Sequence, residues 1–335
     1  MNNPILHTFP LGFPWHTQDP FLFCVYHLDH FPKGNGEMGP DPELLKGRNM
    51  GNDFDPTQKW RMYHGKTIPG FPYHPHRGFE TITVVNKGYC DHSDSLGAAG
   101  RFGEGDVQWM TAGRGVQHSE MFPLLHDDTD NPMELFQIWL NLPKANKFVD
   151  PHFKMLWHEE IPMVKENGVQ IKIIAGGYKD TPALSPAPDS WASNPENEVA
   201  VWNISVEANT QFTLPKASNG TNRTLYFYEG SEIFIGDRKV NSKFGIALDS
   251  TQEVTVKVGA EKAHFLMLQG KPIGEPVAKY GPFVMNTQEE IQQAMEEYQL
   301  TQFGGWPWPH PDHVHDKHRG RFALYPDGSL VEKDS

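Results

Sequence analysis

The sequence predicts an all-β protein with two barrels or sandwiches in one chain and only a few short helices. Three observations lead to this fold class. The chain has 335 residues, and at about 100 to 200 residues per domain this length predicts two domains. Glycine (31 residues) and proline (28) supply many chain reversals, while 38% hydrophobic residues still allow real cores. Short runs rich in β-branched and aromatic residues recur between turn residues from residue 79 onward.

The expected strands form two series. The first includes FETITVV (79–85) and MELFQIWLNL (133–142), each bounded by turn residues. The second has breaks about every 8 to 12 residues and consists of VAVWNISVEA, TQFTLP, TLYFYEG, SEIFIGD, FGIALD, QEVTVKV and AHFLMLQG. Between them, AGGYKDTPALSPAPDSWASNPENE (175–198) fits neither the strand period nor the helix period, which predicts a linker or a long loop.

The two series predict a first barrel over 1–150, a second barrel over 151–300 that includes the loop 175–198, and a C-terminal extension over 301–335. The extension is rich in Pro, Gly and His, and we expect an arm lying on the surface.

One helix is predicted near the end of the second barrel. Thr287 and Glu290 have the spacing of a capping box just before IQQAMEEYQL. Ile291, Met295 and Tyr298 then form an apolar stripe that should dock on a sheet.

Charge and composition exclude several classes of function. There are 29 Lys and Arg against 42 Asp and Glu, a net charge of −13, without a basic stripe, which argues against direct binding of nucleic acid. The start MNNPILHTFP lacks the features of a secretory signal, and no stretch approaches the ~20 apolar residues that span a bilayer. We expect a soluble, cytoplasmic protein that does not bind membranes, with Cys24 and Cys90 free and buried.

Four side chains at strand spacing point to a metal site. His74 and His76 are two residues apart in an extended context, so both imidazoles should point to one face of a strand. His118 and Glu120 have the same spacing. They are preceded by Gly113 and Gly115, which can turn the chain tightly. If the two segments pair, three imidazoles and a carboxylate meet. This ligand set suits a first-row divalent metal, and the ligand types do not choose among iron, manganese, cobalt, nickel, copper and zinc.

A single histidine on a strand is more often a structural residue than a ligand, so each remaining candidate needs its own interpretation. Glu80 lies four residues beyond His76 and, if the strand continues, shares its face; we interpret it as a hydrogen-bond acceptor behind the ligands. His64 and His92 are expected to be framework or pocket-rim residues. A solvated surface is expected for the tail histidines His310, His313, His315 and His318.

The segments HPHRGFETITVV (74–85) and GDVQWMTAGRGVQHSE (105–120) closely resemble the pirin family, a branch of the cupin superfamily. The resemblance continues more weakly through GPFVMNTQEEIQQAMEEYQL and FGGWPW and covers roughly residues 20 to 308. It implies two tandem cupin (jelly-roll-like) β-barrels in one chain. It also implies one metal ion, usually iron, held in the first barrel by His74, His76, His118 and Glu120. The second barrel of the family generally lacks a metal, which agrees with the absence of histidine between His158 and His264.

The resemblance also implies a function. Several pirins resemble quercetin 2,3-dioxygenases, which open the ring of a flavonol with O₂ and release carbon monoxide. Here Fe(II) would be the cofactor, with other first-row metals possible, and Glu120 would be both ligand and catalytic base. A flavonol would need an apolar barrel mouth, for which the candidates are Phe79, Trp109, Met110 and Phe122.

Two other functions compete with this prediction. The first is a non-enzymatic, iron-dependent regulator that acts through a partner protein, as some family members are described. The second is a cupin whose metal is only structural. We expect a monomer, because a chain with two barrels can bury its own sheet faces.

Overall fold

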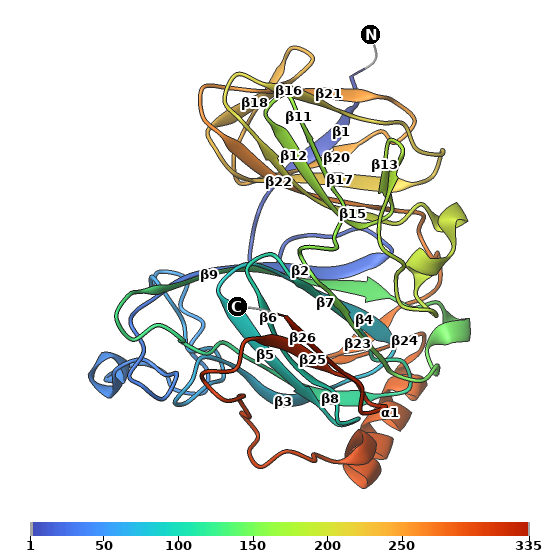
Figure 1. The fold of residues 1–335 in the computed structure, drawn as a ribbon. Coiled ribbons are helices and arrows are strands. Elements are labelled where there is room, and N and C mark those ends of the chain that lie inside the picture. The colour runs from blue at the N-terminus through green and yellow to red at the C-terminus, as the bar shows by residue number, and fades with distance from the viewer. Residues whose placement is uncertain (1–2, 334–335) are drawn as a thin grey trace. The chain divides into compact units, whose positions relative to one another are not determined.

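The computed structural model describes residues 3–333 and consists mostly of antiparallel β-strands (Figure 1). Within these residues the single α-helix is α1 (Gln288–Thr301), and five short 3₁₀ turns accompany it. They are η1 (Pro42–Leu45), η2 (Lys144–Asn146), η3 (Trp191–Ser193), η4 (Pro195–Asn197) and η5 (Gln302–Gly304). The prediction of an all-β protein with a few short helices is confirmed.

The chain forms two compact units, and neither is one continuous stretch of sequence. We call the unit that contains Tyr26–Gln137, Lys144–His158 and the chain from Glu275 onward the first unit. The second unit contains the chain up to Val25, Ile138–Pro143 and Glu159–Gly274.

These units differ from the contiguous blocks 1–150, 151–300 and 301–335 that the sequence suggested. The reason is strand pairing over long separations in sequence. Strand β1 (Ile5–Pro10) pairs with β20 (Phe244–Leu248), which places the start of the chain in the second unit. Near the other end, β25 (Arg321–Leu324) pairs with β6 (Ala99–Gly103), so the extension belongs to the first unit.

Two sheets build most of the first unit, and two of their strands continue into the second unit at residues 21–25 and 138–141. The six-stranded sheet has the order β26-β25-β6-β5-β8-β3, and the five-stranded sheet has the order β10-β7-β4-β9-β2. Their remaining strands are β26 (Leu330–Lys333), β5 (Tyr89–Asp94), β8 (Val116–Met121), β3 (Gly70–His76), β10 (His152–Leu156), β7 (Val107–Thr111), β4 (Phe79–Lys87), β9 (Asn131–Asn141) and β2 (Phe21–Phe31). The predicted strands 79–85 and 133–142 correspond to β4 and β9.

A seven-stranded sheet, β1-β20-β17-β22-β15-β12-β11, and a four-stranded sheet, β16-β21-β18-β19, build the second unit. Their inward-facing side chains form one large apolar core that includes Ile171, Ile204 and Phe265. The strands are β17 (Asn222–Glu229), β22 (Ala263–Gly270), β15 (Ala200–Val206), β12 (Val169–Ala175), β11 (Met163–Glu166), β16 (Gln211–Leu214), β21 (Val254–Val258), β18 (Glu232–Ile235) and β19 (Arg238–Asn241).

The segment 175–198 is a long loop of the second unit and does not link the two units. It contains the short pair β13 (Gly177–Tyr178) and β14 (Thr181–Pro182), followed by η3 and η4. The long-loop interpretation is therefore the one the structure supports.

The predicted helix and its capping box are confirmed. The Thr287 hydroxyl accepts a hydrogen bond from the Glu290 amide at 3.2 Å, and the Glu290 carboxylate accepts one from the Thr287 amide at 3.1 Å. The apolar side of α1 packs on the small hairpin of β23 (Ala278–Tyr280) and β24 (Phe283–Met285).

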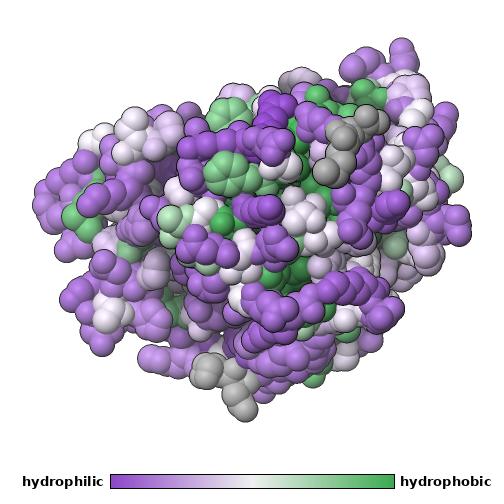
Figure 2. All heavy atoms as spheres, turned by 90° about the horizontal axis from the view of Figure 1, so that it is seen from above, coloured by the Kyte–Doolittle hydropathy of each residue, from purple (hydrophilic) through white to green (hydrophobic). Residues whose placement is uncertain are grey.

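In the described part of the chain no helix is both long and apolar enough to cross a bilayer. On the face shown in Figure 2, hydrophilic residues predominate and hydrophobic residues form small separate groups. Cys24 and Cys90 are free and fully buried, as the sequence predicted.

Candidate metal centre

Strands β3 and β8 bring the two predicted ligand pairs together. They pair antiparallel, with His74 directly opposite His118 and Phe71 opposite Glu120. Three steps on β3 thus match two steps on β8, so β3 contains a bulge between Phe71 and His74. Because one extra residue reverses the face of every side chain that follows, the bulge puts His74 on the face shared by His118 and Glu120.

The turn before β8 requires its glycines. Gly113 and Gly115 have φ of +48° and +134°. A Cβ on Gly113 would lie 2.2 Å from the carbonyl oxygen of Val149, and one on Gly115 would lie 2.7 Å from the Phe303 ring. The chain therefore reverses between β7 and β8 in a way that other residues would obstruct.

The three histidines converge. Ring nitrogens of His74, His76 and His118 all lie within 4.8 Å of one another. The Nε2 atoms of His74 and His118 are 3.1 Å apart. Two nitrogens bound at a right angle to one ion, each at about 2.1 Å, are about 3.0 Å apart. The observed separation therefore fits two neighbouring ligands of a single metal ion.

The protonation of the cluster also fits a cation. His74 Nδ1 lies 2.9 Å from the carbonyl oxygen of Pro72, which places its proton on Nδ1 and leaves the Nε2 lone pair toward His118. Burial lowers the pKa of His74 to about 4 and the pKa values of His76 and His118 well below the usual range. All three rings are therefore neutral at pH 7, the form that binds metals. His118 Nδ1 is buried and has no hydrogen-bond partner among the described residues.

Glu120 is held beside this cluster by two polar side chains. Its Oε2 lies 3.9 Å from His118 Nε2. Thr83 on β4 contacts its Oε1 at 2.8 Å, and Gln137 on β9 donates to its Oε2 at 2.5 Å. Burial raises the pKa of Glu120, while the hydrogen bonds from Thr83 and Gln137 act in the opposite direction. The bond from Thr83 also shows that the two sheets of the first unit face each other across the site.

The wall opposite the histidines comes from β4 and β7. In their pairing, Thr81 lies opposite Met110 and Thr83 opposite Gln108, so these four share the face of the site. The Phe79 ring lies 5.0 Å from the His76 ring. Of the predicted lining residues, Phe79 and Met110 therefore face the site. Trp109 pairs with Ile82 on the opposite face of the strands and does not.

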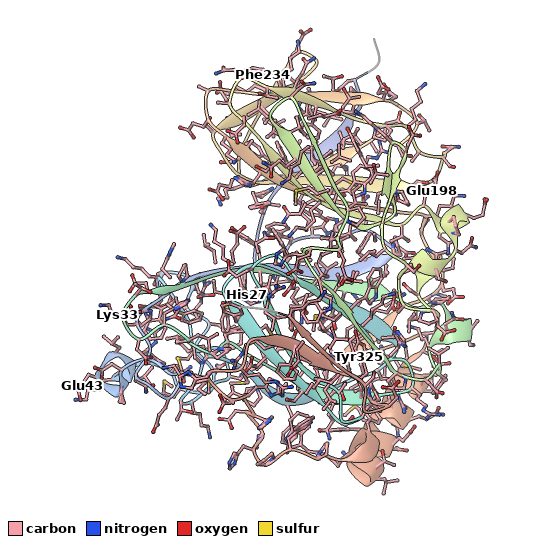
Figure 3. All side chains as sticks on the ribbon, in the orientation of Figure 1. His27, Lys33, Glu43, Glu198, Phe234 and Tyr325 are labelled. Carbon is pink, nitrogen blue, oxygen red and sulfur yellow. The ribbon has the colours of Figure 1, made fainter. Side chains whose placement is uncertain are left out.

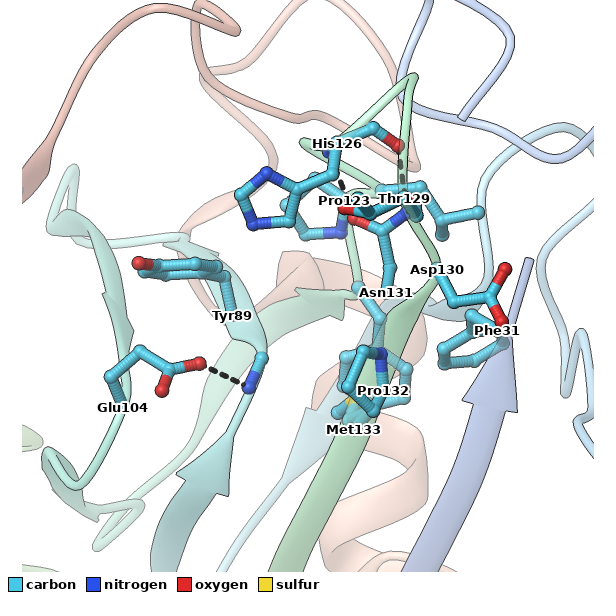
Figure 4. A pocket seen from close by; sticks show the side chains of 13 residues that line it. Phe31, Tyr89, Glu104, Pro123, His126, Thr129, Asp130, Asn131, Pro132 and Met133 are labelled. Atoms are coloured by element: carbon cyan, nitrogen blue, oxygen red, sulfur yellow. Dashed lines mark hydrogen bonds between the residues drawn. The ribbon is translucent and has the colours of Figure 1, made fainter. Parts of the chain in front are cut away.

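The fourth predicted lining residue, Phe122, lines a different cavity. That cavity has a volume of about 220 Å³ and contains none of the candidate ligands (Figure 4). Figure 4 shows Glu104 accepting a hydrogen bond from the backbone of Gly88, and the turn from His126 to Asn131 closing another side.

His92 and Glu80 differ in how they relate to the centre. His92 lies opposite Glu120 in the β5–β8 pairing, is fully buried, and stacks on Phe153 at 5.0 Å. It is thus a buried framework residue, and its Nε2 is 3.2 Å from Asp94. For Glu80 the assumption of a continuous strand is wrong, because β3 ends at His76. Gly78, which has a φ of +84°, then turns the chain into the other sheet. Glu80 accepts a hydrogen bond from Thr111 at 2.8 Å.

His64 also has a framework role. Its Nδ1 lies 2.8 Å from the carbonyl oxygen of Gly51, and its ring packs against Phe54 at 4.9 Å.

Sequence reasoning missed Thr83, Gln137 and the burial of His92. Thr83 and Gln137 come from the sheet opposite the ligands, and nothing local in the sequence pairs them with Glu120. The available signal was a polar side chain at an inward position of an otherwise apolar strand, as in FETITVV and MELFQIWLNL.

The extension packs over the outer face of the six-stranded sheet, which corrects the prediction of a solvated surface position for His315. The fully buried Arg101 donates to the carbonyl oxygens of His315, Asp316 and Arg319 at 3.2, 2.9 and 2.8 Å. His315 is only 7% exposed, whereas His310 and His318 are exposed. The arm is fixed because Arg101, inside a strand, supplies donors that the sequence of the arm does not reveal.

Comparisons with known proteins agree with this architecture. A family model described as Pirin matches residues 43–140, and one described as Pirin C-terminal cupin domain matches residues 201–304. Over 262 residues the chain is 36% identical to a Pseudomonas aeruginosa protein named "Putative quercetin 2,3-dioxygenase PA3240", covering 78% of this chain and 87% of that one.

Two further relatives extend the comparison. Human pirin is 33% identical over 264 residues, covering 77% of this chain and 86% of pirin. Among solved structures, a quercetin 2,3-dioxygenase from Acinetobacter baumannii superposes with a TM-score of 0.67 at 27% identity, covering 90% of this chain and 96% of that one. The predicted cupin architecture is confirmed.

Proposed function

The chain belongs to the pirin family, and from this premise we propose that it is a metal-dependent dioxygenase that opens the ring of a quercetin-type flavonol with O₂ and releases carbon monoxide. The observation that carries the proposal is the cluster of three neutral histidines, two of them buried, with a carboxylate 3.9 Å from one of them. The names of two relatives, a protein named for quercetin 2,3-dioxygenase activity and a solved quercetin 2,3-dioxygenase, support the substrate class.

The proposed ligands are His74, His76, His118 and Glu120. We propose Fe(II) as the ion, since it accepts this set of nitrogen and oxygen ligands; the other first-row metals share that property. When bound, such an ion supplies Lewis-acid and one-electron chemistry to a hydroxylated aromatic substrate and O₂. For an ion that takes six ligands, such as Fe(II), these four side chains would leave positions for substrate, so we favour turnover over a purely structural ion.

Glu120 is the proposed base for the 3-hydroxyl of the flavonol. A buried carboxylate with a raised pKa accepts a proton more readily than an ordinary one. The Thr83 hydroxyl lies 2.8 Å from Glu120 Oε1 and 2.5 Å from Gln137 Oε1 but has a single proton. It can donate to Glu120 when the carboxylate is ionised, and to Gln137 once Glu120 carries the proton. Thr83 and Gln137 can therefore form hydrogen bonds that suit both the ionised and the protonated form of Glu120.

The apolar wall would hold the aromatic rings and exclude water. Phe79, Met110 and Phe153 are all nearly or fully buried on the site face. Apolar and aromatic lining with a few placed polar groups is typical of small-molecule sites. We place the reaction in the cytoplasm and in a monomer; the free, buried thiols of Cys24 and Cys90 suit a reducing compartment.

The test combines metal content with turnover. The purified protein should contain about one first-row metal per chain, and His76→Ala should lose it. Iron-loaded protein should bleach quercetin, consume O₂ and form carbon monoxide, and Glu120→Gln should lose this activity. Retention of full metal by His76→Ala would contradict the site. If no first-row metal supports bleaching, the regulator that acts through a partner protein becomes the better account.

A further inference from the structure

A second cavity, of about 460 Å³, lies in the second unit beneath the loop 175–198. This volume is in the range of small-molecule sites, about 300 to 1,000 Å³. One side comes from the loop and includes Pro182, Leu184 and Asn194. Glu198, labelled in Figure 3 just after the short turns η3 and η4, also lines it. The site is separate from the metal centre, because all its lining residues belong to the second unit.

The strand side of the cavity is one end of the barrel interior. Arg223 lies opposite Gln269 in the β17–β22 pairing, and Gln269 lies opposite Ala200 at the start of β15. Trp202 follows two residues later on β15, on the same face. Leu225, two residues after Arg223, belongs to the apolar core, so all these side chains face inward.

Two buried hydrogen-bond donors in this cavity lack partners. Arg223 is 2% exposed, and its Nε donates to Gln269 at 2.7 Å. Its Nη1 has no hydrogen-bond partner among residues 3–333, and the same is true of Nε1 of Trp202, also 2% exposed. Leaving a buried donor without a hydrogen-bond partner is costly, and the cost is larger for a charged group. Both groups can only donate, so their missing partner is an acceptor.

The charges around the cavity favour an anion. Arg223 and Lys216 line it, and Glu198 is the acidic residue among its lining residues. Both oxygens of Glu198 already accept hydrogen bonds from Ser218 and Thr221. Burial lowers the pKa of Arg223 to about 10, opposed by the charges of Glu198 and Asp249. The guanidinium therefore keeps its charge at neutral pH.

We propose that this cavity is a binding site for a small organic carboxylate with an apolar body. The carboxylate accepts hydrogen bonds from the Arg223 guanidinium, Trp202 donates to a second ligand oxygen, and the body lies against Pro182, Leu184 and Pro215. The apolar lining favours this class over inorganic phosphate, which would leave those walls without contact. The proposal does not depend on the function of the metal centre.

Calorimetric titration of the full-length protein with benzoate tests the proposal. Benzoate should bind with one site per chain, whereas benzamide, its neutral analogue, and inorganic phosphate should bind at least about tenfold more weakly. Arg223→Gln should weaken benzoate binding at least about tenfold, and Trp202→Phe, which keeps an aromatic ring but loses the donor, should weaken it several-fold. Arg238→Gln changes an exposed arginine of the same unit and should leave binding unchanged.

A second arm separates this cavity from the metal centre. Benzoate binding should persist after chelation of metal and in His76→Ala, and its loss in either case would assign the binding to the metal centre and overturn the proposal. Absence of binding to the wild-type protein, preference for phosphate, or unchanged binding in Arg223→Gln would also overturn it. If Arg223→Gln does not fold, Trp202→Phe decides, with unchanged affinity counting against the site.

Discussion

Thr83 and Gln137 fix the orientation of the Glu120 carboxylate without any help from a metal ion. Both of its oxygens are engaged, at 2.8 Å by Thr83 and at 2.5 Å by Gln137, from strands of the opposite sheet. A carboxylate ordered in this way pays little conformational entropy when a cation arrives. The metal affinity of the centre therefore depends on side chains that are not themselves ligands.

Thr83→Val tests this dependence. Valine has nearly the shape of threonine but lacks the hydroxyl, so Glu120 loses one orienting contact. We expect metal affinity to fall about 10- to 100-fold, measured by competition with a chelator. Thr81→Val is the matched control, because Thr81 shares the strand and face but its buried hydroxyl has no hydrogen-bond partner in the described chain. Equal losses in both variants would contradict the orienting role.

The lowered pKa of the buried His27 should make the stability of the fold depend on pH. Burial, with a smaller contribution from the Arg61 charge, lowers the pKa of His27 from 6.5 to about 3 in the folded protein. Below pH 6.5 the unfolded chain therefore binds a proton that the folded chain does not. The stability contribution is present above that pH and is lost as the pH falls toward 3.

Urea unfolding of the metal-free protein at several pH values between 7 and 4 measures this effect. Each such histidine should contribute up to about 1.4 kcal/mol per pH unit to the slope. His27→Gln cannot titrate, so its free energy of unfolding should fall less steeply with acid than that of the wild type. An unchanged slope would show that His27 is not kept neutral by the fold.

At the scale of single elements, local sequence patterns predicted a helix or strand correctly where neighbouring residues determine its structure. The capping box of α1 depends on two residues three apart, and the run FETITVV is rich in β-branched residues within one strand. The rules failed for Glu80, because a single glycine, Gly78, ended the strand that was assumed to continue. The bulge in β3 was equally invisible, since it exists only relative to β8.

Thr287→Ala tests the element most clearly predicted. Loss of the hydroxyl removes the acceptor of the Glu290 amide at the start of α1. The free energy of unfolding should fall by about 1 kcal/mol, within the range of roughly 0.5 to 2 for such caps. Gln293→Ala, at an exposed position inside the same helix, is the control and should cause little change. A similar loss in both variants would argue against a specific capping contribution.

At the scale of the whole molecule, the sequence predicted the number and kind of barrels but not which parts of the chain build each one. The strand patterns and the ligand pairs are local features, and both were readable. The pairing of β1 with β20 and of β25 with β6 joins distant segments, and no property of either partner alone identifies the other. Prediction of the three-histidine cluster succeeded although β3 and β8 are separated in the sequence by four strands, because the matching two-residue spacing of the ligand pairs marked both partners.

Arg101 links the extension to the six-stranded sheet, and its loss should affect the molecule as a whole. Its guanidinium forms two bonds of 2.7 and 2.8 Å with the buried Asp91 as well as those with the arm. Arg101→Met leaves the Asp91 charge buried and unpaired, which should cost about 3 to 5 kcal/mol in chemical denaturation.

Arg114→Met is the matched control for this substitution. Arg114 pairs with Asp150 at 2.9 Å, but the two side chains are 63% and 79% exposed. Solvent screens such a pair, so only a small change is expected. Equal effects of the two substitutions would show that the arm contributes nothing through Arg101.

The hairpin of β25 and β26 occupies the position next to β6, and this has a consequence for self-association. Without it, β6 would be an open border of the sheet, with unpaired backbone groups able to recruit a strand from another molecule. With it, the border is the short strand β26, which carries Glu332 and Lys333 and so discourages such recruitment. Proteolytic removal of the β25–β26 hairpin would thus be expected to make the protein aggregate through the exposed edge of β6.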